Sequence, residues 1–171
     1  MRNHKFYFVL IFAMAFLIIL ICVQYSKIIA LEKNIGEVHL NNIRYVKAHV
    51  RSEKKALINS SYMKEEDISR NQWRFNEFIQ LRLPGGLFDY YFASIRDDYR
   101  LLSEAPEAGR NKDDIEISKQ RIIDKLSIVE SALGLIEEYC GEDPIKYYGL
   151  TKDSEIMDIV NSRIQAHINE Y

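Results

Sequence analysis

The stretch LIILICVQYSKIIALEKNIGEV, residues 17–38, changes from uniformly apolar to one-sidedly apolar, and it decides the fold. Its first part belongs to FYFVLIFAMAFLIILICV, residues 6–23, eighteen residues without a charge, a proline or a glycine. At a helical rise of 1.5 Å per residue this run spans about 27 Å, close to the ~30 Å hydrocarbon core of a bilayer. The sequence therefore predicts a transmembrane helix over residues 6–23, preceded by a short tail, residues 1–5.

Three other interpretations of the run explain it less well. A cleaved signal peptide has an apolar region of about 7–15 residues followed by a small-x-small site. Here the Ala-x-Ala pattern, Ala13 to Ala15, lies inside the run, and a later candidate site has Ile28 where a small residue is needed. A lipoprotein signal needs a small residue before its cysteine, but Ile21 precedes Cys22. A buried core helix is seldom so long and unbroken at a chain end. We favour an uncleaved signal anchor in the cell membrane.

Basic residues on the two sides of the run predict its orientation. Arg2, Lys5 and the α-amino group precede it, whereas Lys27 and Lys33 follow it. Because positive charge is enriched on the cytoplasmic side, this margin favours a cytoplasmic N-terminus and an extracytoplasmic bulk. A basic cluster over residues 44–55 favours the opposite orientation, at a greater distance from the run.

A single helix is expected to continue from the membrane to about residue 58. Ile28, Leu31, Ile35 and Val38 follow a 3–4–3 spacing, which is typical of one helix face. The stripe then drifts by one place and continues through Ile43, Val46, Val50 and Leu57. Such a helix is not stable alone in water, so the stripe needs a partner.

Four more helices are predicted, over residues 62–82, 87–103, 112–140 and 153–170, with a loop between the last two. Ser69 and Gln72 fit a capping box, and Ile68 and Trp73 fit the hydrophobic staple around it. Pro84 begins a Pro-Gly-Gly break between two helices. The most regular segment, 112–140, places one seam at heptad spacing and ends before Gly141, a residue typical of helix C-caps. The seam consists of Ile115, Lys119, Ile122, Leu126, Val129, Leu133, Ile136 and Cys140.

These patterns predict an all-α protein, in which residues 24–171 form a four- or five-helix antiparallel bundle on an N-terminal transmembrane helix. Segments 62–82 and 87–103 together match the length of the first extramembrane helix. Stacked end to end they would give four long helices. Five separate helices is the alternative.

Few residues suggest chemistry. The net charge of −2 and the lack of a basic stripe argue against nucleic-acid binding. The four histidines show no metal-binding spacing, and no phosphate-binding loop or nucleophile elbow occurs. Cys140 lies on the apolar seam, as a small hydrophobe would. We therefore expect no catalytic residue, no metal and no cofactor, and the protein is predicted not to be an enzyme.

Eight aromatic residues crowd into positions 73–99, around the Pro-Gly-Gly break. They are expected to form mainly an aromatic core, but Tyr90 and Tyr91 cannot both face it. We therefore name Trp73, Tyr90, Tyr91 and Tyr99 as a candidate partner or ligand surface. The predicted function is a single-pass membrane protein that binds a protein partner or self-associates. The alternative is an extracytoplasmic small-ligand-binding or sensory helical module.

Overall fold

The computed structural model describes residues 2–59, 65–84, 86–104, 112–150 and 155–168, and within these ranges it holds six helices and no strand. The prediction of an all-α protein is confirmed. The helices are α1 (Arg2–Asn59), α2 (Glu65–Gln80), α3 (Leu87–Glu104), α4 (Lys112–Cys140), α5 (Pro144–Gly149) and α6 (Glu155–Ile168).

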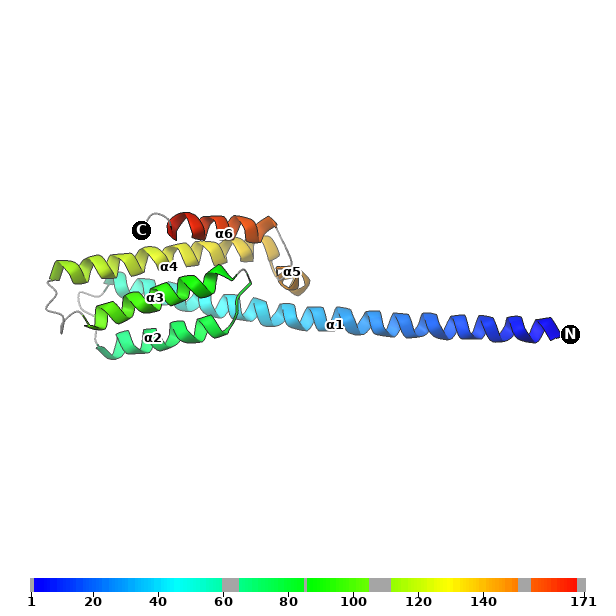
Figure 1. Ribbon diagram of the computed structural model, residues 1–171. Helices are drawn as coiled ribbons and strands as arrows, with labels where there is room; N and C mark the ends of the chain where they lie inside the picture. The colour runs from blue at the N-terminus through cyan, green and yellow to red at the C-terminus, as the bar shows by residue number, and fades with distance from the viewer. Residues whose placement is uncertain (1, 60–64, 85, 105–111, 151–154, 169–171) are drawn as a thin grey trace.

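The 58-residue helix α1 is the longest element, about 87 Å at 1.5 Å per residue. It begins at Arg2, so residues expected to form a short tail are helical. Its N-terminal part extends alone, and its C-terminal part lies beside the other helices (Figure 1). From Tyr7 onward, the first buried residue of α1 is Gly36, and from Leu40 onward one face of the helix contributes to the core.

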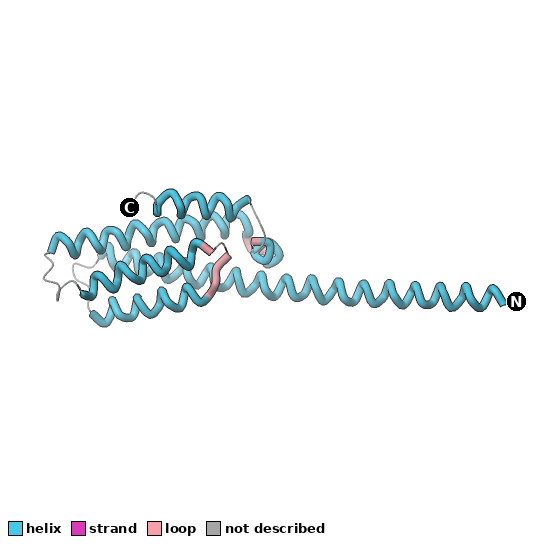
Figure 2. Tube along the Cα trace, viewed as in Figure 1, coloured by secondary structure: helices cyan, strands magenta, loops and turns pink. Residues whose placement is uncertain are grey.

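The long helices run in alternating directions along the C-terminal part of α1 (Figure 1). The helices α2 and α3 pack closely side by side and are joined by the short loop at 81–86 (Figure 2). Of the two arrangements left open by the sequence, end-to-end stacking is therefore wrong. The backbone reverses between them because Arg82 and Gly86 adopt positive φ angles of 46° and 55° around Pro84. Reversal lets the two apolar faces bury one another.

The helix α2 lies within the predicted range of 62–82, but the predicted capping box is wrong. The helix already includes Glu65, so Ser69 lies within it and cannot cap it. Trp73 is 65% exposed, whereas Ile68 is buried, so the two do not form a hydrophobic staple. The acidic first turn, Glu65 to Asp67, complements the positive end of the helix dipole instead.

The helix α4 buries the predicted seam. Its members from Ile122 to Cys140 are buried, and Gly141 after it has a φ of 61°, a conformation that favours glycine. The following segment, expected to be a loop, contains the helix α5. Asp143 caps this helix by accepting a hydrogen bond from the backbone N–H of Ile145 at 3.0 Å, and Pro144 occupies the first turn. The Asp-Pro pair that caps α5 can be recognised in the sequence. The helix itself is too short to show the apolar periodicity by which the other helices were predicted.

A row of ion pairs joins α1 to α4 and to the turn that follows α4. Its members are Arg44 with Glu142, Lys47 with Glu137, and both Arg51 and Lys54 with Glu130. Positions that rise along α1 pair with positions that fall from Glu142 to Glu130, so the row follows the antiparallel register. Because the basic side chains all come from α1 and the acidic ones from α4 and the turn after it, a shifted register would separate several pairs at once.

The backbones of α1 and α5 approach each other closely at Gly36. A Cβ atom added at Gly36 would overlap the carbonyl group of Pro144. The glycine in α1 is therefore required by packing, because no larger residue leaves room for α5 at this distance.

We predict that Gly36→Ala lowers the free energy of unfolding by about 1–3 kcal/mol, the usual cost of overpacking a tight contact. Gly134→Ala is the matched control, because the nearest atom to its new Cβ is the Lys47 Nζ at an ordinary 3.7 Å. The control should gain about 0.5–1 kcal/mol from helix propensity. Thermal unfolding of the full chain in mild detergent, followed by circular dichroism, measures both. Equal stability of the two variants would contradict the close approach.

Candidate functional site

The N-terminal part of α1 is a candidate membrane-binding site. From Tyr7 to Leu31 its large apolar side chains are exposed all round the helix. The helix is long and apolar enough to cross a membrane, and the apolar window has no buried residue. Such a helix near an N-terminus is also typical of a signal sequence.

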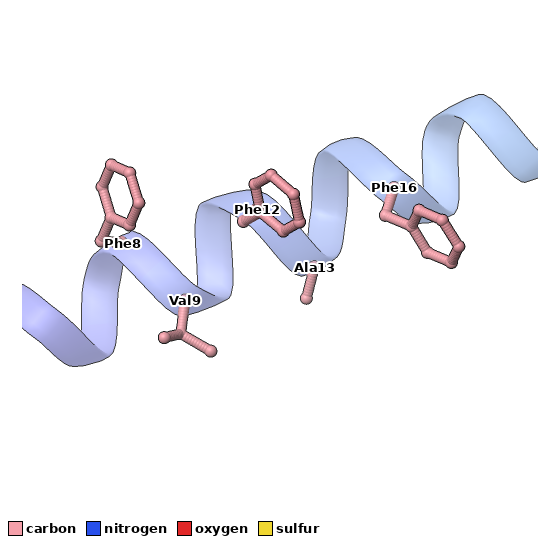
Figure 3. A pocket seen from close by; sticks show the side chains of 5 residues that line it. All are labelled: Phe8, Val9, Phe12, Ala13 and Phe16. Atoms are coloured by element: carbon pink, nitrogen blue, oxygen red, sulfur yellow. The ribbon is translucent and has the colours of Figure 1, made fainter.

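A shallow groove on this helix is lined by Phe8, Val9, Phe12, Ala13 and Phe16 (Figure 3). Phenylalanines four residues apart lie one above another on a helix, and the groove is the space between their rings. All five side chains are hydrocarbon, so the groove can contact other apolar groups but offers no hydrogen bond and no titratable group. Its chemistry suits lipid chains or another apolar helix.

Between the apolar run and the packed part of α1, the predicted stripe is largely uncovered. Ile28, Leu31 and Val38 are 53%, 60% and 56% exposed, and Ile35 is partly buried. We expected this stripe to pack within the protein itself. Packing instead begins at Gly36, because α5 is the element that reaches furthest along α1.

The four residues of the predicted aromatic surface do not lie together. Trp73 and Tyr90 are exposed on α2 and α3, whereas Tyr91 and Tyr99 are buried. Tyr91 lies four residues before Ile95, on the buried face of α3, so helical phase alone separates it from Tyr90. Trp73 and Tyr90 remain accessible to a partner.

Most of the other aromatic residues form a packed cluster between α2 and α3. Phe75 contacts the rings of Phe78, Phe92 and Tyr99 at centroid distances of 5.4, 6.1 and 5.8 Å, and Phe88 contacts Phe92 at 5.9 Å. These distances are those of directly contacting rings. The aromatic concentration around the Pro-Gly-Gly break therefore forms core.

A buried polar cluster connects α1, α2 and α3. The Glu53 carboxylate accepts a hydrogen bond from the Tyr99 hydroxyl at 2.8 Å and another from the Asn71 side-chain amide. Burial raises the pKa of Glu53, while hydrogen bonding to Tyr99 and the charges of Arg74 and Arg70 act against that rise. Burial and the nearby Glu53 raise the pKa of Tyr99 well above its ordinary value. The cluster holds three helices together at the end of α1 remote from the apolar run.

Two further polar contacts tie α3 to its neighbours. Lys125 of α4 forms a buried ion pair with Asp98 and donates to the Ser94 hydroxyl at 2.7 Å. Tyr91 of α3 shares a hydrogen bond of 2.6 Å with His167 of α6. Sequence reasoning missed these contacts because each joins residues far apart in the chain. Buried charges and polar groups are stable only when they are paired. These contacts therefore explain why Asp98, Lys125 and the Tyr91 hydroxyl can lie on otherwise apolar faces of α3 and α4.

The described residues include no group of three histidine, cysteine or acidic side chains arranged to hold a metal ion. Both cysteines are free: Cys22 is exposed on α1 and Cys140 is buried. Burial raises the pKa of the Cys140 thiol to about 11, which disfavours the nucleophilic thiolate at neutral pH. Comparison with known proteins finds no matching family model, no similar curated protein and no similar solved structure.

We predict that Glu53→Gln changes how stability depends on pH. In the folded chain the pKa of Glu53 is raised above 4.5, its ordinary value, so the folded state binds more protons in the window above pH 4.5. The free energy of unfolding contributed by Glu53 therefore falls as the pH rises through that window. The glutamine variant keeps an acceptor for Tyr99 and Asn71 but lacks this slope, so its stability relative to wild type should increase from pH 4.5 to 7.

Urea unfolding of the full chain in detergent at a series of pH values measures this difference. Glu53→Ala is the control for loss of the acceptor, and it should cost about 1–3 kcal/mol because two buried donors lose their partner. Parallel pH profiles for wild type and Glu53→Gln would contradict a raised pKa.

Proposed function

We propose that the protein is a single-pass membrane protein in which residues 6–23 of α1 span a bilayer and the remaining helices form an antiparallel bundle outside it. The bundle acts by protein–protein interaction or assembly at the membrane. The observation that carries the proposal is the exposed apolar surface that surrounds α1 from Tyr7 onward. A helix that is apolar all round and packed on nothing is typical of a membrane span.

The energetics of insertion support the span. Residues 6–23 contain thirteen Leu, Ile, Phe and Val residues. Each favours insertion by about 0.3–0.6 kcal/mol near the helix centre, so together they contribute about 4–8 kcal/mol. No charge within the run opposes this gain.

For orientation we propose a cytoplasmic N-terminus and an extracytoplasmic bundle. The excess of basic residues before the run supports this orientation. Four residues of the basic cluster that favours the reverse, Arg44, Lys47, Arg51 and Lys54, pair with acids of α4 and of the turn after it. Their presence is therefore explained by packing within the bundle, which weakens them as a signal of topology.

An interaction role is favoured over ligand binding because the aromatic region is filled with its own side chains. Tyr91 and Tyr99 are buried there, so they cannot contact a ligand without rearrangement of the core. Trp73 and Tyr90 stand on the outer surfaces of α2 and α3, where large aromatic side chains often anchor protein partners. Catalysis is not part of the proposal.

We predict that Met14→Arg with Leu17→Arg removes stable membrane association. Each arginine near the centre of the span costs about 2.5–3.5 kcal/mol, so two offset most of the gain from the apolar residues. Sedimentation with membranes after an alkaline carbonate wash measures retention, and Met14→Ala with Leu17→Ala is the uncharged control. Release of wild type by carbonate would contradict the proposal, as would a mature chain lacking residues 1–23.

A second prediction concerns topology. A reporter enzyme that folds only outside the cytoplasm, fused after Tyr171, should be active, and a reporter that works only inside should be inactive at the same position. Removing basic residues before the span tests what sets the orientation. Arg2→Gln with Lys5→Gln should reduce the activity of the reporter that folds only outside the cytoplasm, because it reverses the excess of basic residues across the span. Activity of the inside reporter on the wild-type chain would reverse the proposed orientation.

A further inference from the structure

An uncovered stripe of apolar side chains runs along α1 next to the proposed membrane span, and the role we assign to it rests on that span. Ile28, Leu31 and Val38 are each more than half exposed, and Ile35 is partly buried. They lie after the apolar run and before most of the packed part of α1. Gly36 lies thirteen positions after Val23, about 20 Å along the helix. This connecting helix therefore carries apolar side chains into water without cover from its own chain.

The spacing of the stripe is that of a helix that packs against another helix. Intervals of three, four and three residues put Ile28 and Ile35 at position a of a heptad and Leu31 and Val38 at position d. The same register extends back through Gln24, Ile21 and Leu17 into the apolar run. A second helix that followed this seam would therefore also lie beside the first within the bilayer.

Charged residues beside the stripe indicate which helix fits. Lys27 occupies position g and Glu32 position e of this register. In a parallel pair of identical helices, position g of one helix lies next to position e five residues later on the other, so Lys27 meets Glu32 of the second copy, twice by symmetry. In an antiparallel pair, position g meets position g and position e meets position e, so Lys27 would not meet Glu32 and the attraction would be lost. The charges therefore favour a parallel second copy.

The rest of the chain leaves most of this face open. Gly36 faces Pro144 of α5, and Leu31 and Val38 lie about 140° and 160° around the helix from Gly36. Ile35 lies about 100° from Gly36 and is partly buried. Leu40 and Ile43 then turn toward the protein's own core. The stripe thus ends where α1 begins to pack within its own chain.

We propose that this stripe binds a second copy of the chain, with the two α1 helices packed in parallel from Ile28 to Val38. A bilayer favours the same arrangement, because copies inserted with one orientation hold their α1 helices parallel and at high local concentration. The two bundles then stand side by side beyond Val38.

Disulfide crosslinking of the full chain in phosphatidylcholine vesicles tests the contact. In a Cys22→Ala background, Leu31→Cys places a thiol at position d and Lys33→Cys places one on the opposite face. Cys140 stays in both variants as a buried thiol. Under mild oxidation we expect Leu31→Cys to form a product of twice the chain mass at least about ten times faster than Lys33→Cys. Equal rates would overturn the proposal.

Charge reversal tests the parallel register. Lys27→Glu or Glu32→Lys alone turns two attractive pairs into repulsive ones, and we expect each to weaken dimerisation about tenfold. The double variant, Lys27→Glu with Glu32→Lys, should restore it. Förster transfer between labelled full-length chains in the same vesicles measures the dimer fraction. Two single variants that dimerise like wild type, or a double variant that fails to recover, would overturn the parallel arrangement.

The membrane span and the second copy can fail separately. Flotation of each variant with vesicles reports the span. A chain that floats but crosslinks no faster at Leu31→Cys than at Lys33→Cys keeps the span and loses the dimer. Protection of Leu31→Cys from a water-soluble maleimide without a crosslinked product would assign the stripe to lipid and overturn the second copy. A chain that does not float would overturn the span itself.

Discussion

Because α1 is one unbroken helix from Arg2 to Asn59, its exposed apolar part and its packed part share a single axis. The packed part begins where Gly36 lets the backbone of Pro144 approach. From there onward the other long helices lie along α1 in alternating directions (Figure 1). A kink in α1 would change the direction of the apolar part relative to all of them. The continuity of this one helix is therefore the constraint on which the other features depend.

Two kinds of contact hold the packed part of α1, and they differ in size. Fully burying a side chain such as Ile43 or Val46 contributes about 1.5–3 kcal/mol. Each ion pair between α1 and the acidic residues from Glu130 to Glu142 contributes much less, because its members are exposed or partly exposed and water screens their charges. The apolar core therefore supplies most of the stability. The ion pairs act mainly on register, since their charges match only in the antiparallel arrangement.

The exposed surfaces of the molecule differ in chemistry from one part of the chain to the next. The first part of α1 is apolar on every side, the connecting helix is apolar along one stripe, and the packed helices expose scattered aromatic residues such as Trp73 and Tyr90. Each suits a different environment: hydrocarbon around the helix, one partner helix along the stripe, and a polar surface with a few aromatic contacts elsewhere. The proposed span and the proposed dimer both follow from this order along α1.

Helical phase and caps are short-range properties, so the sequence alone determined the all-α class, the buried seam of α4 and the end of that helix at Gly141. The sequence also implies that Tyr90 and Tyr91 face different directions, because adjacent residues differ by about 100° around a helix. It did not determine how α2 and α3 pack, since a Pro-Gly-Gly break permits both stacking and reversal.

Only the tertiary structure decided which apolar stripe finds a partner within the chain. The stripe at Ile28 to Val38 and the face at Leu40 to Leu57 have similar spacing, yet the first is mostly exposed and the second is buried. Periodicity states that a face is apolar, not what covers it. The cover depends on how far the remaining helices reach along α1, and that limit is set by contacts between distant residues, among them Gly36 with Pro144 and Glu53 with Tyr99.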